Sequence, residues 1–387
     1  MSSLTKPQYL MTDIVTNHMA YPGGRNNVNY TAFNPFNQKS QYHPPCNIDF
    51  TNIQSVETCW AGDDLVALAD LRTEDPAIRD TWNKWITQMV AKFKIDGLRL
   101  DSALEVEPSF WPGFGKAAGV YQVGEVLNTD PIFVASYQPA MDGLLNYPLF
   151  FWITNAFAST GGSIKGLVDG LTALTAVPKI DLGLWGTFME NHDQVRFPSY
   201  TNDLSLVKNA LTYTMLYDGI PIIYQGQEQH FGGGVAPNNR EALWFSNFST
   251  TAPLYGWIAN LNAVRARAIA QDKNYLPSKA AIIHADQRTV AFRKGPDGAQ
   301  LVSAYANVGA GNTFAFTLSA NQTGFKAGDK LLELTRCNAT TVGADGNLAV
   351  LSTTGEPLVY YPVAQLAGSG ICTPVTGELF PVVFCLT

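Results

Sequence analysis

The sequence predicts an α/β fold: a parallel (β/α) barrel that carries a small inserted domain and is followed by a C-terminal antiparallel β-sandwich domain. Strand-like apolar runs alternate with helical runs up to about residue 272. A polar, aromatic stretch rich in Gly, Pro and Asn interrupts them at 19–70. From 273 onward, alternating strand patterns separated by turn residues replace the helices. The predicted domains are therefore a barrel (1–18 and 71–272), an inserted domain (19–70) and a β-sandwich (273–387).

Composition and charge exclude several classes of protein. A chain of 387 residues that is 46% hydrophobic and 15% charged is expected to bury a large core. The net charge is −7 and no basic stripe is present, so nucleic acid is not an expected partner. The first residues contain no apolar segment of the kind found in signal peptides, and no apolar run is long enough to span a bilayer. No membrane partner is expected.

The barrel elements follow in chain order. Tyr9–Val15 is a short apolar run and is predicted to be a buried strand. Asp75–Lys94 is predicted to be a helix, because Pro76 suits its first turn and apolar residues recur every three or four positions. The strand at 94–101 follows and ends in Arg99 and Asp101. Further predicted elements are strand Val120–Val126, strand Asp142–Tyr147, helix Ser163–Leu174, strand Gly186–Asn191, helix Leu204–Tyr217 and strand Ile220–Tyr224. The count is six strands.

Polar side chains stand at the ends of four of these strands. They are Asp13 with Asn17 and His18, Arg99 with Asp101, Glu125, and Glu190 with Asn191, His192 and Asp193. Each group alone has a structural explanation, such as an ion pair, a residue beside a helix cap or a core histidine. A closing barrel, however, brings its strand ends around one mouth, where three carboxylates would converge.

Converging carboxylates with an arginine and histidines favour glycoside chemistry. Cleaving an acetal requires one carboxylate at the anomeric carbon and one protonated carboxyl that assists the leaving oxygen. Crowded like charges raise one pKa and leave the other group ionised. No Ser/His/Asp set and no phosphate-binding loop offers a competing interpretation.

Four segments in order resemble the α-amylases of glycoside hydrolase family thirteen, and the connecting text is similar to the secreted fungal type. The segments are Asp13–His18 (DIVTNH), Gly97–Asp101 (GLRLD), Gly124–Leu127 (GEVL) and Phe188–Asp193 (FMENHD). The resemblance extends over nearly the whole chain and includes Asp142–Pro148, Asp218–Tyr224 and Gly226–His230. It implies a TIM-type (β/α)8 barrel and retaining endo-hydrolysis of α-1,4-glucosidic bonds in starch, glycogen and maltooligosaccharides.

The resemblance also implies roles for individual residues. Asp101 would be the nucleophile and Glu125 the acid/base, while Asp193 would bind sugar hydroxyls and favour the distorted ring. The residues that would position the substrate or these carboxylates are His18, Arg99, His192 and Arg240. A structural calcium ion would be bound by the side chains of Asn17 and Asp70 and by the carbonyls of Glu57 and Glu105, since hard oxygen ligands suit Ca²⁺.

Five cysteines, Cys46, Cys59, Cys337, Cys372 and Cys385, form no metal-binding pattern, although the first two are close enough in sequence to staple a loop. The resemblance implies disulfides Cys46–Cys59 and Cys337–Cys372 and leaves Cys385 in a tail it does not cover. It also implies a secreted monomer acting on α-glucans. Sequons at Asn29, Asn247, Asn321 and Asn338 permit glycosylation.

Three departures from the family keep alternatives open. Family members carry two further strands with their helices before Asp13, so the chain is expected to begin inside the usual barrel. The lysine and histidine that usually follow the nucleophile strand are Leu104 and Glu105 here, and an aspartate expected before Arg240 is Ala236. The first departure motivates a non-catalytic glucan-binding isoform. The change at Leu104 and Glu105, on the acceptor side of the substrate site, motivates a 4-α-glucanotransferase.

Overall fold

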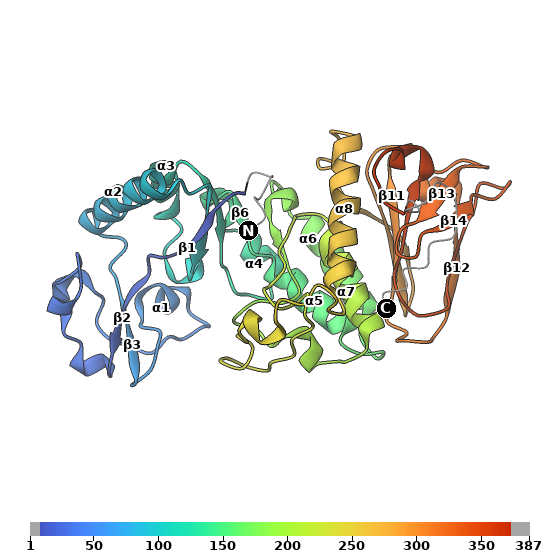
Figure 1. Ribbon diagram of the computed structural model, residues 1–387. Helices are drawn as coiled ribbons and strands as arrows, with labels where there is room; N and C mark the ends of the chain where they lie inside the picture. The colour runs from blue at the N-terminus through green and yellow to red at the C-terminus, as the bar shows by residue number, and fades with distance from the viewer. Residues whose placement is uncertain (1–7, 373–387) are drawn as a thin grey trace. The chain divides into compact units, whose positions relative to one another are not determined.

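The computed structural model describes residues 8–372, and Cys385 lies outside them. The chain divides into two compact units, one ending at Tyr147 and one beginning at Pro148 (Figure 1). The domain boundaries expected at 18, 70 and 272 stay predictions.

A parallel sheet organises the first unit. Its order is β1-β4-β5-β6, with bounds Met11–Val15, Gly97–Asp101, Tyr121–Gly124 and Gly143–Leu144. In the register, Val15 lies opposite Asp101 and Leu100 lies opposite Gly124. Parallel pairing places the carboxyl ends of the strands at one edge, so the residues that follow these strands are brought together there.

Helix α2 (Pro76–Phe93) is the longest helix among residues 8–147, and it confirms the helix predicted at Asp75–Lys94. Asp75 caps its start by accepting a hydrogen bond from the N–H of Ala77, and Lys94 ends it in the left-handed conformation. Its buried face packs against α3. The other α-helices of this unit are α1 (Ile53–Thr58), α3 (Trp111–Ala118) and α4 (Pro131–Ala135). The 3₁₀ turns η4 (Ala103–Glu105) and η5 (Gln138–Ala140) follow β4 and α4.

The stretch expected to form an inserted domain contains an antiparallel strand pair, β2 (His18–Pro22) with β3 (Val66–Asp70). The pairing places His18 opposite Asp70. Between these strands the chain forms α1 and the 3₁₀ turns η1 (Arg25–Asn27), η2 (Tyr30–Ala32) and η3 (Lys39–Gln41). The disulfide Cys46–Cys59 is present, as predicted.

The second unit begins with helices around a short parallel pair, β7 (Gly186–Thr187) and β8 (Ile220–Pro221). These strands are shorter than predicted, because the chain after Thr187 turns into loops and the pairing ends with the bond from the Ile222 N–H to the Thr187 carbonyl. The α-helices are α5 (Tyr147–Phe157), α6 (Ile164–Thr175), α7 (Leu204–Leu216) and α8 (Tyr255–Gln271). The 3₁₀ turns are η6 (Leu182–Leu184), η7 (Phe197–Ser199) and η8 (Leu243–Ser246). The helices predicted at Ser163–Leu174 and Leu204–Tyr217 correspond to α6 and α7.

One prediction near the boundary of the units is wrong. The strand expected over Asp142–Tyr147 ends at Leu144, and Tyr147 instead begins α5. The reason is local: Pro148 favours the first turn of a helix. The apolar residues that follow it are buried on several sides, so their pattern shows no clear period.

The C-terminal part is an antiparallel sandwich, as predicted. A six-stranded sheet in the order β14-β13-β16-β11-β10-β9 accompanies the pair β12-β15. The bounds are β9 (Ala281–Ala285), β10 (Thr289–Lys294), β11 (Leu301–Ala306), β12 (Phe314–Leu318), α9 (Ala320–Thr323), β13 (Lys330–Glu333), β14 (Asn338–Thr341), β15 (Leu348–Ser352), β16 (Leu358–Pro362) and η9 (Val363–Leu366). The disulfide Cys337–Cys372 is present, as predicted.

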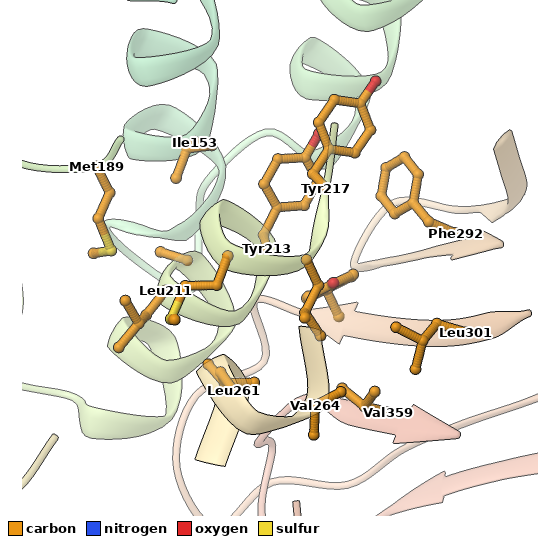
Figure 2. Close-up of a cluster of buried hydrophobic side chains, with 14 of the residues drawn as sticks. Ile153, Met189, Leu211, Tyr213, Tyr217, Leu261, Val264, Phe292, Leu301 and Val359 are labelled. Atoms are coloured by element: carbon orange, nitrogen blue, oxygen red, sulfur yellow. The ribbon is translucent and has the colours of Figure 1, made fainter. Parts of the chain in front are cut away.

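The two faces of the six-stranded sheet pack against different partners. Val290 and Phe292 of β10 belong to a core shared with α5–α8, whereas Ala291 belongs to a core shared with β12 and β15. This follows from the two-residue period of a strand. Figure 2 shows Tyr213 of α7 and Tyr217, which directly follows α7, in the first core, where their stacked rings meet Phe292 edge-on.

Within residues 8–372, no helix has the length and apolar character needed to cross a membrane.

Candidate active site

Arg99 connects three carboxylates of the first unit. Its Nη1 donates to Asp13 Oδ1 at 2.9 Å and to Asp101 Oδ1 at 2.5 Å, and its Nη2 lies 2.8 Å from Glu125 Oε2. Asp13 lies opposite Arg99 in the β1–β4 register, and Asp101 lies two residues along β4, so its side chain is on the same face. Glu125 directly follows β5. Neighbouring strand ends thus gather the predicted nucleophile, acid/base and arginine.

Ser102 contacts both predicted catalytic carboxyls. Its hydroxyl donates to Asp101 Oδ2 at 2.8 Å, and its backbone N–H donates to Glu125 Oε2 at 3.1 Å. The residue adopts the left-handed conformation, with φ 49°, which is uncommon for a serine. The turn after β4 therefore aims a main-chain donor at one carboxyl and a side-chain donor at the other.

The pKa of Asp101 lies below its usual range. Burial by itself would raise it, but the hydrogen bond from Ser102 and the charge of Arg99 together outweigh burial. Asp101 is therefore an ionised carboxylate at neutral pH, which is the form that can attack carbon.

The pKa of Glu125 is raised instead. Burial is the main cause, since only 8% of the residue is exposed, and Arg99 opposes it. The Tyr147 hydroxyl donates to Glu125 Oε1 at 2.9 Å. Two carboxyls that share one arginine thus have pKa values displaced in opposite directions, a pattern typical of a nucleophile paired with a proton donor.

His18 begins β2 beside this pair. Burial lowers its pKa, and the charge of Asp101 opposes that effect. The ring is therefore mostly neutral near pH 7 and can both donate and accept hydrogen bonds. This suits contact with sugar hydroxyls.

A second group of predicted residues lies in the loop after β7, in the second unit. Arg240 Nη2 donates to Asp193 Oδ1 at 3.0 Å, and His192 Nε2 lies 3.1 Å from Asp193 Oδ2. Asn239 Nδ2 donates to the carbonyls of His192 and Gln194 and so fixes the path of the loop. The structure thus brings Asp193, His192 and Arg240 together within their own unit.

Buried charged residues stabilise the loop that carries His192 and Asp193. Arg196 is fully buried between Glu190 and Glu241, and its guanidinium lies 4.2 Å from the centre of the Tyr224 ring. Burial raises the pKa of Glu190 to about 7, although Arg196 opposes it. Glu190 therefore has a structural role, since its carboxylate accepts from Arg196 and from the N–H of Phe197.

The predicted calcium ligands also lie in the first unit. Asn17 and Asp70 are almost completely buried, and the Oδ1 atom of each has no hydrogen-bond partner within residues 8–372. A buried oxygen without a partner is costly unless something binds it. Helix α1, which carries Glu57, packs against η4, which carries Glu105. This donor set of amide, carboxylate and carbonyl oxygens fits a hard cation such as Ca²⁺.

The remaining predicted residues are Leu104 and Glu105. Both lie in η4, directly after Asp101, and the N–H of Leu104 donates to the carbonyl of Glu125 at 3.3 Å. Glu105 Oε2 accepts from Asn17 Nδ2 at 3.0 Å. Their position beside Asp101 and Glu125 agrees with the prediction that they lie near the acceptor side of the substrate site.

Sequence reasoning assigned no role to three residues of this network. The residue pattern places Asp13 at a strand end without a partner and Tyr147 in a strand, and it assigns nothing to Ser102. The register of β1 against β4 would have identified Asp13. The roles of Ser102 and Tyr147 depend on backbone geometry and on the start of α5, which the residue pattern does not reveal.

Comparison with known proteins identifies the family. Residues 5–244 match the catalytic domain of α-amylase, and residues 282–378 match α-amylase domain C. The chain belongs to the α-amylase family. The predicted resemblance is therefore confirmed, and this family member is a glycoside hydrolase of the α-amylase type.

Relatives from yeasts and a solved fungal structure agree. Alpha-amylase 2 of Schwanniomyces occidentalis is 42% identical over 94% of this chain and 71% of its own length. Alpha-amylase 1 of Lipomyces kononenkoae is 45% identical over 94% of this chain and 58% of its own length. The solved α-amylase of Malbranchea cinnamomea has a TM-score of 0.91 and 42% identity, covering 94% of this chain and 76% of that one.

Proposed function

We propose that this family member hydrolyses internal α-1,4-glucosidic bonds of starch, glycogen and maltooligosaccharides with retention of configuration. Asp101 would be the nucleophile and Glu125 the acid/base. The observation that carries this assignment is the pair of carboxyls bridged by Arg99, with one pKa lowered and the other raised.

The first chemical step uses the two carboxyls together. Protonated Glu125 gives its proton to the glycosidic oxygen while ionised Asp101 attacks the anomeric carbon. The bond between that carbon and the leaving oxygen breaks, and an ester forms between the sugar and Asp101. Arg99 and Ser102 hold Asp101 in its attacking orientation.

The second step returns the enzyme to its starting state. Glu125, now a carboxylate, takes a proton from water, and the water oxygen attacks the same carbon. The ester bond breaks and Asp101 leaves as a carboxylate. Two inversions at one carbon give net retention.

The other predicted residues would bind and shape the substrate. His18 and His192 would hydrogen-bond hydroxyls of the sugar at the cleavage point, and Asp193, held by Arg240, would favour the distorted ring. These roles come from the family resemblance. The local contacts of each residue support them.

We further propose that Ca²⁺ binds the side chains of Asn17 and Asp70 and the carbonyls of Glu57 and Glu105. The unpartnered oxygens of Asn17 and Asp70 support this proposal. When bound, the ion supplies positive charge that fixes the turn after β4, and it takes no part in bond cleavage. The two disulfides suit an oxidising compartment, so we expect export, whereas a monomeric state stays a prediction.

The test of the hydrolase assignment is the release of reducing ends from starch or from a blocked maltooligosaccharide. Glu125→Gln should abolish release, because a glutamine cannot donate the proton at the leaving oxygen. Asp80→Asn, on the exposed face of α2, serves as a control and should keep wild-type activity. Turnover that persists in Glu125→Gln would sink the assignment.

A second candidate is 4-α-glucanotransfer at the same site. The observation that favours it is an apolar and an acidic residue, Leu104 and Glu105, in the turn beside the carboxyl pair. Such residues alter the binding of an acceptor and so shift the competition between water and sugar. Products longer than the substrate at high maltooligosaccharide concentration would support transfer. Their absence counts against it.

A further inference from the structure

Asn17 is held by its amide nitrogen, and its oxygen is left available. Asn17 Nδ2 donates to Glu105 Oε2 at 3.0 Å and lies 3.4 Å from His18 Nδ1. Its Oδ1, on the other side of the amide, has no hydrogen-bond partner within residues 8–372 although only 1% of the residue is exposed. An amide rotated by half a turn would place its oxygen against the Glu105 carboxylate, where two acceptors repel. The charge on Glu105 therefore selects one orientation of Asn17.

Asp70 presents the same arrangement from the opposite strand. Its Oδ2 lies 2.5 Å from His43 Nδ1, whereas its Oδ1 has no hydrogen-bond partner among the described residues. Asp70 is fully buried and lies opposite His18, the residue that follows Asn17. The N–H of Leu71 also donates to the Asn17 carbonyl at 2.8 Å, which fixes the two strands together. Each of the two predicted ligands is thus held by one side-chain atom and leaves one oxygen unused.

Glu105 lies close to this pair of oxygens. Its Oε2 accepts from Asn17 Nδ2 at 3.0 Å, and its carboxylate is near enough to Asp70 for the two charges to interact. The side chain is thus an additional acidic group that faces Asp70.

We propose that the Glu105 carboxylate is a positioning residue for the calcium site, because it holds the Asn17 amide with its oxygen toward the cation and adds negative charge nearby. The inference rests on the calcium site proposed above. It assigns the side chain a task separate from that of the Glu105 carbonyl. Partners of this kind orient metal ligands in many proteins, and their loss typically weakens metal binding about 10- to 100-fold.

The test measures calcium affinity rather than turnover, because Glu105 is also near Asp101 and Glu125. The full chain is stripped with a chelator and titrated with Ca²⁺ by calorimetry. Glu105→Ala removes both the acceptor and the charge, and its Kd should rise about 10- to 100-fold. Glu105→Gln can still accept from Asn17 but carries no charge, and its Kd should lie between those of the wild type and Glu105→Ala. The isosteric glutamine also guards against a folding defect.

Two variants serve as controls, and circular dichroism establishes that each is folded. Asp80→Asn removes an exposed charge on α2 and should leave the Kd unchanged. Asn17→Ala removes the proposed ligand itself and should weaken binding at least as much as Glu105→Ala.

Three outcomes overturn the inference. They are a Glu105→Ala Kd equal to that of the wild type, a Glu105→Gln Kd equal to that of Glu105→Ala, and a wild-type chain that binds no calcium. Starch hydrolysis is assayed separately on the same wild-type sample. A chain that hydrolyses starch without binding calcium would overturn this inference and leave the hydrolase assignment intact. A chain that binds calcium but does not hydrolyse starch would overturn the hydrolase assignment and leave this inference intact.

Discussion

At the scale of single residues, the arginine of β4 controls the charge of the reaction site. Arg99 lowers the pKa of both Asp101 and Glu125. Without Arg99, mainly hydrogen bonds, from Ser102 to both carboxyls and from Tyr147 to Glu125, would oppose burial, and both pKa values would rise. The assignment of nucleophile and acid therefore depends on one cation shared between them.

Replacing Arg99 should move the whole pH profile. In Arg99→Ala both pKa values rise, so the acid limb of kcat/KM, set by ionisation of Asp101, and the alkaline limb, set by protonation of Glu125, should both shift to higher pH. The maximum rate should fall by about 100-fold or more, because a charged donor to the nucleophile is lost. Arg99→Lys keeps the charge and should lie closer to the wild type. If both limbs of the kcat/KM profile of Arg99→Ala lie at the same pH values as in the wild type, this account is wrong.

Tyr147 should affect only the alkaline limb. Its hydrogen bond lowers the pKa of Glu125, so Tyr147→Phe should raise that pKa and keep the acid protonated to higher pH. The alkaline limb of the pH profile then moves up while the acid limb stays unchanged. Tyr30→Phe, in the stretch between β2 and β3, serves as the matched control. A shift of the acid limb instead would mean that Tyr147 acts on Asp101.

At the scale of elements, α8 carries much of the core of the second unit. Leu261 is 1% exposed and packs in the cluster that joins α7, α8 and the C-terminal sheet. Leu261→Ala should lower the free energy of unfolding by about 2–5 kcal/mol, the usual effect of an unfilled cavity. Leu351→Ala on β15, where 57% of the leucine is exposed, should cost far less. Urea titration followed by tryptophan fluorescence measures both.

The sequence predicted element types better than their ends. Period-based reasoning found α2 and α6, each of which buries one face, and the residue pattern also predicted α7, which is buried on nearly every side. It missed α5, which is apolar on several sides, and it extended β7 and β8 into segments that form loops. The apolar period therefore does not fix where an element ends, and it did not identify the apolar run of α5 as a helix.

Part of the candidate site could also be predicted from the sequence. Asp101 ends β4 and Glu125 directly follows β5. The strand pattern and the family motifs were therefore enough to predict both as site residues. The role of Ser102 was not predictable, because both its main-chain N–H and its hydroxyl reach the two carboxyls only through the left-handed backbone of the turn after β4. The unpartnered oxygens of Asn17 and Asp70 likewise appear only when the partners of every buried atom are known.

At the scale of the whole molecule, the two disulfides close loops of different length. Cys46–Cys59 are 13 residues apart and Cys337–Cys372 are 35 apart. A chain-entropy account gives a loss of about 3 kcal/mol for opening the first and about 4 kcal/mol for opening the second. Paired Cys→Ser variants should therefore both unfold at lower temperature, with the Cys337/Cys372 pair affected more. Calorimetric melting of the two variants checks the order, and the reverse order would contradict this account.

The six-stranded sheet also sets a limit on how the protein can be shortened. One face of the sheet and the helices α5–α8 bury each other in a single core, which includes Phe292, Leu301 and Val359 (Figure 2). Deleting the sheet would leave that side of the helices in water, and isolating the sheet would do the same to its inner face. The loop that carries Asp193 precedes α7 in this same unit. The β-sandwich thus helps to support the loop that carries Asp193. An engineer who removes it as an accessory domain should expect an insoluble protein.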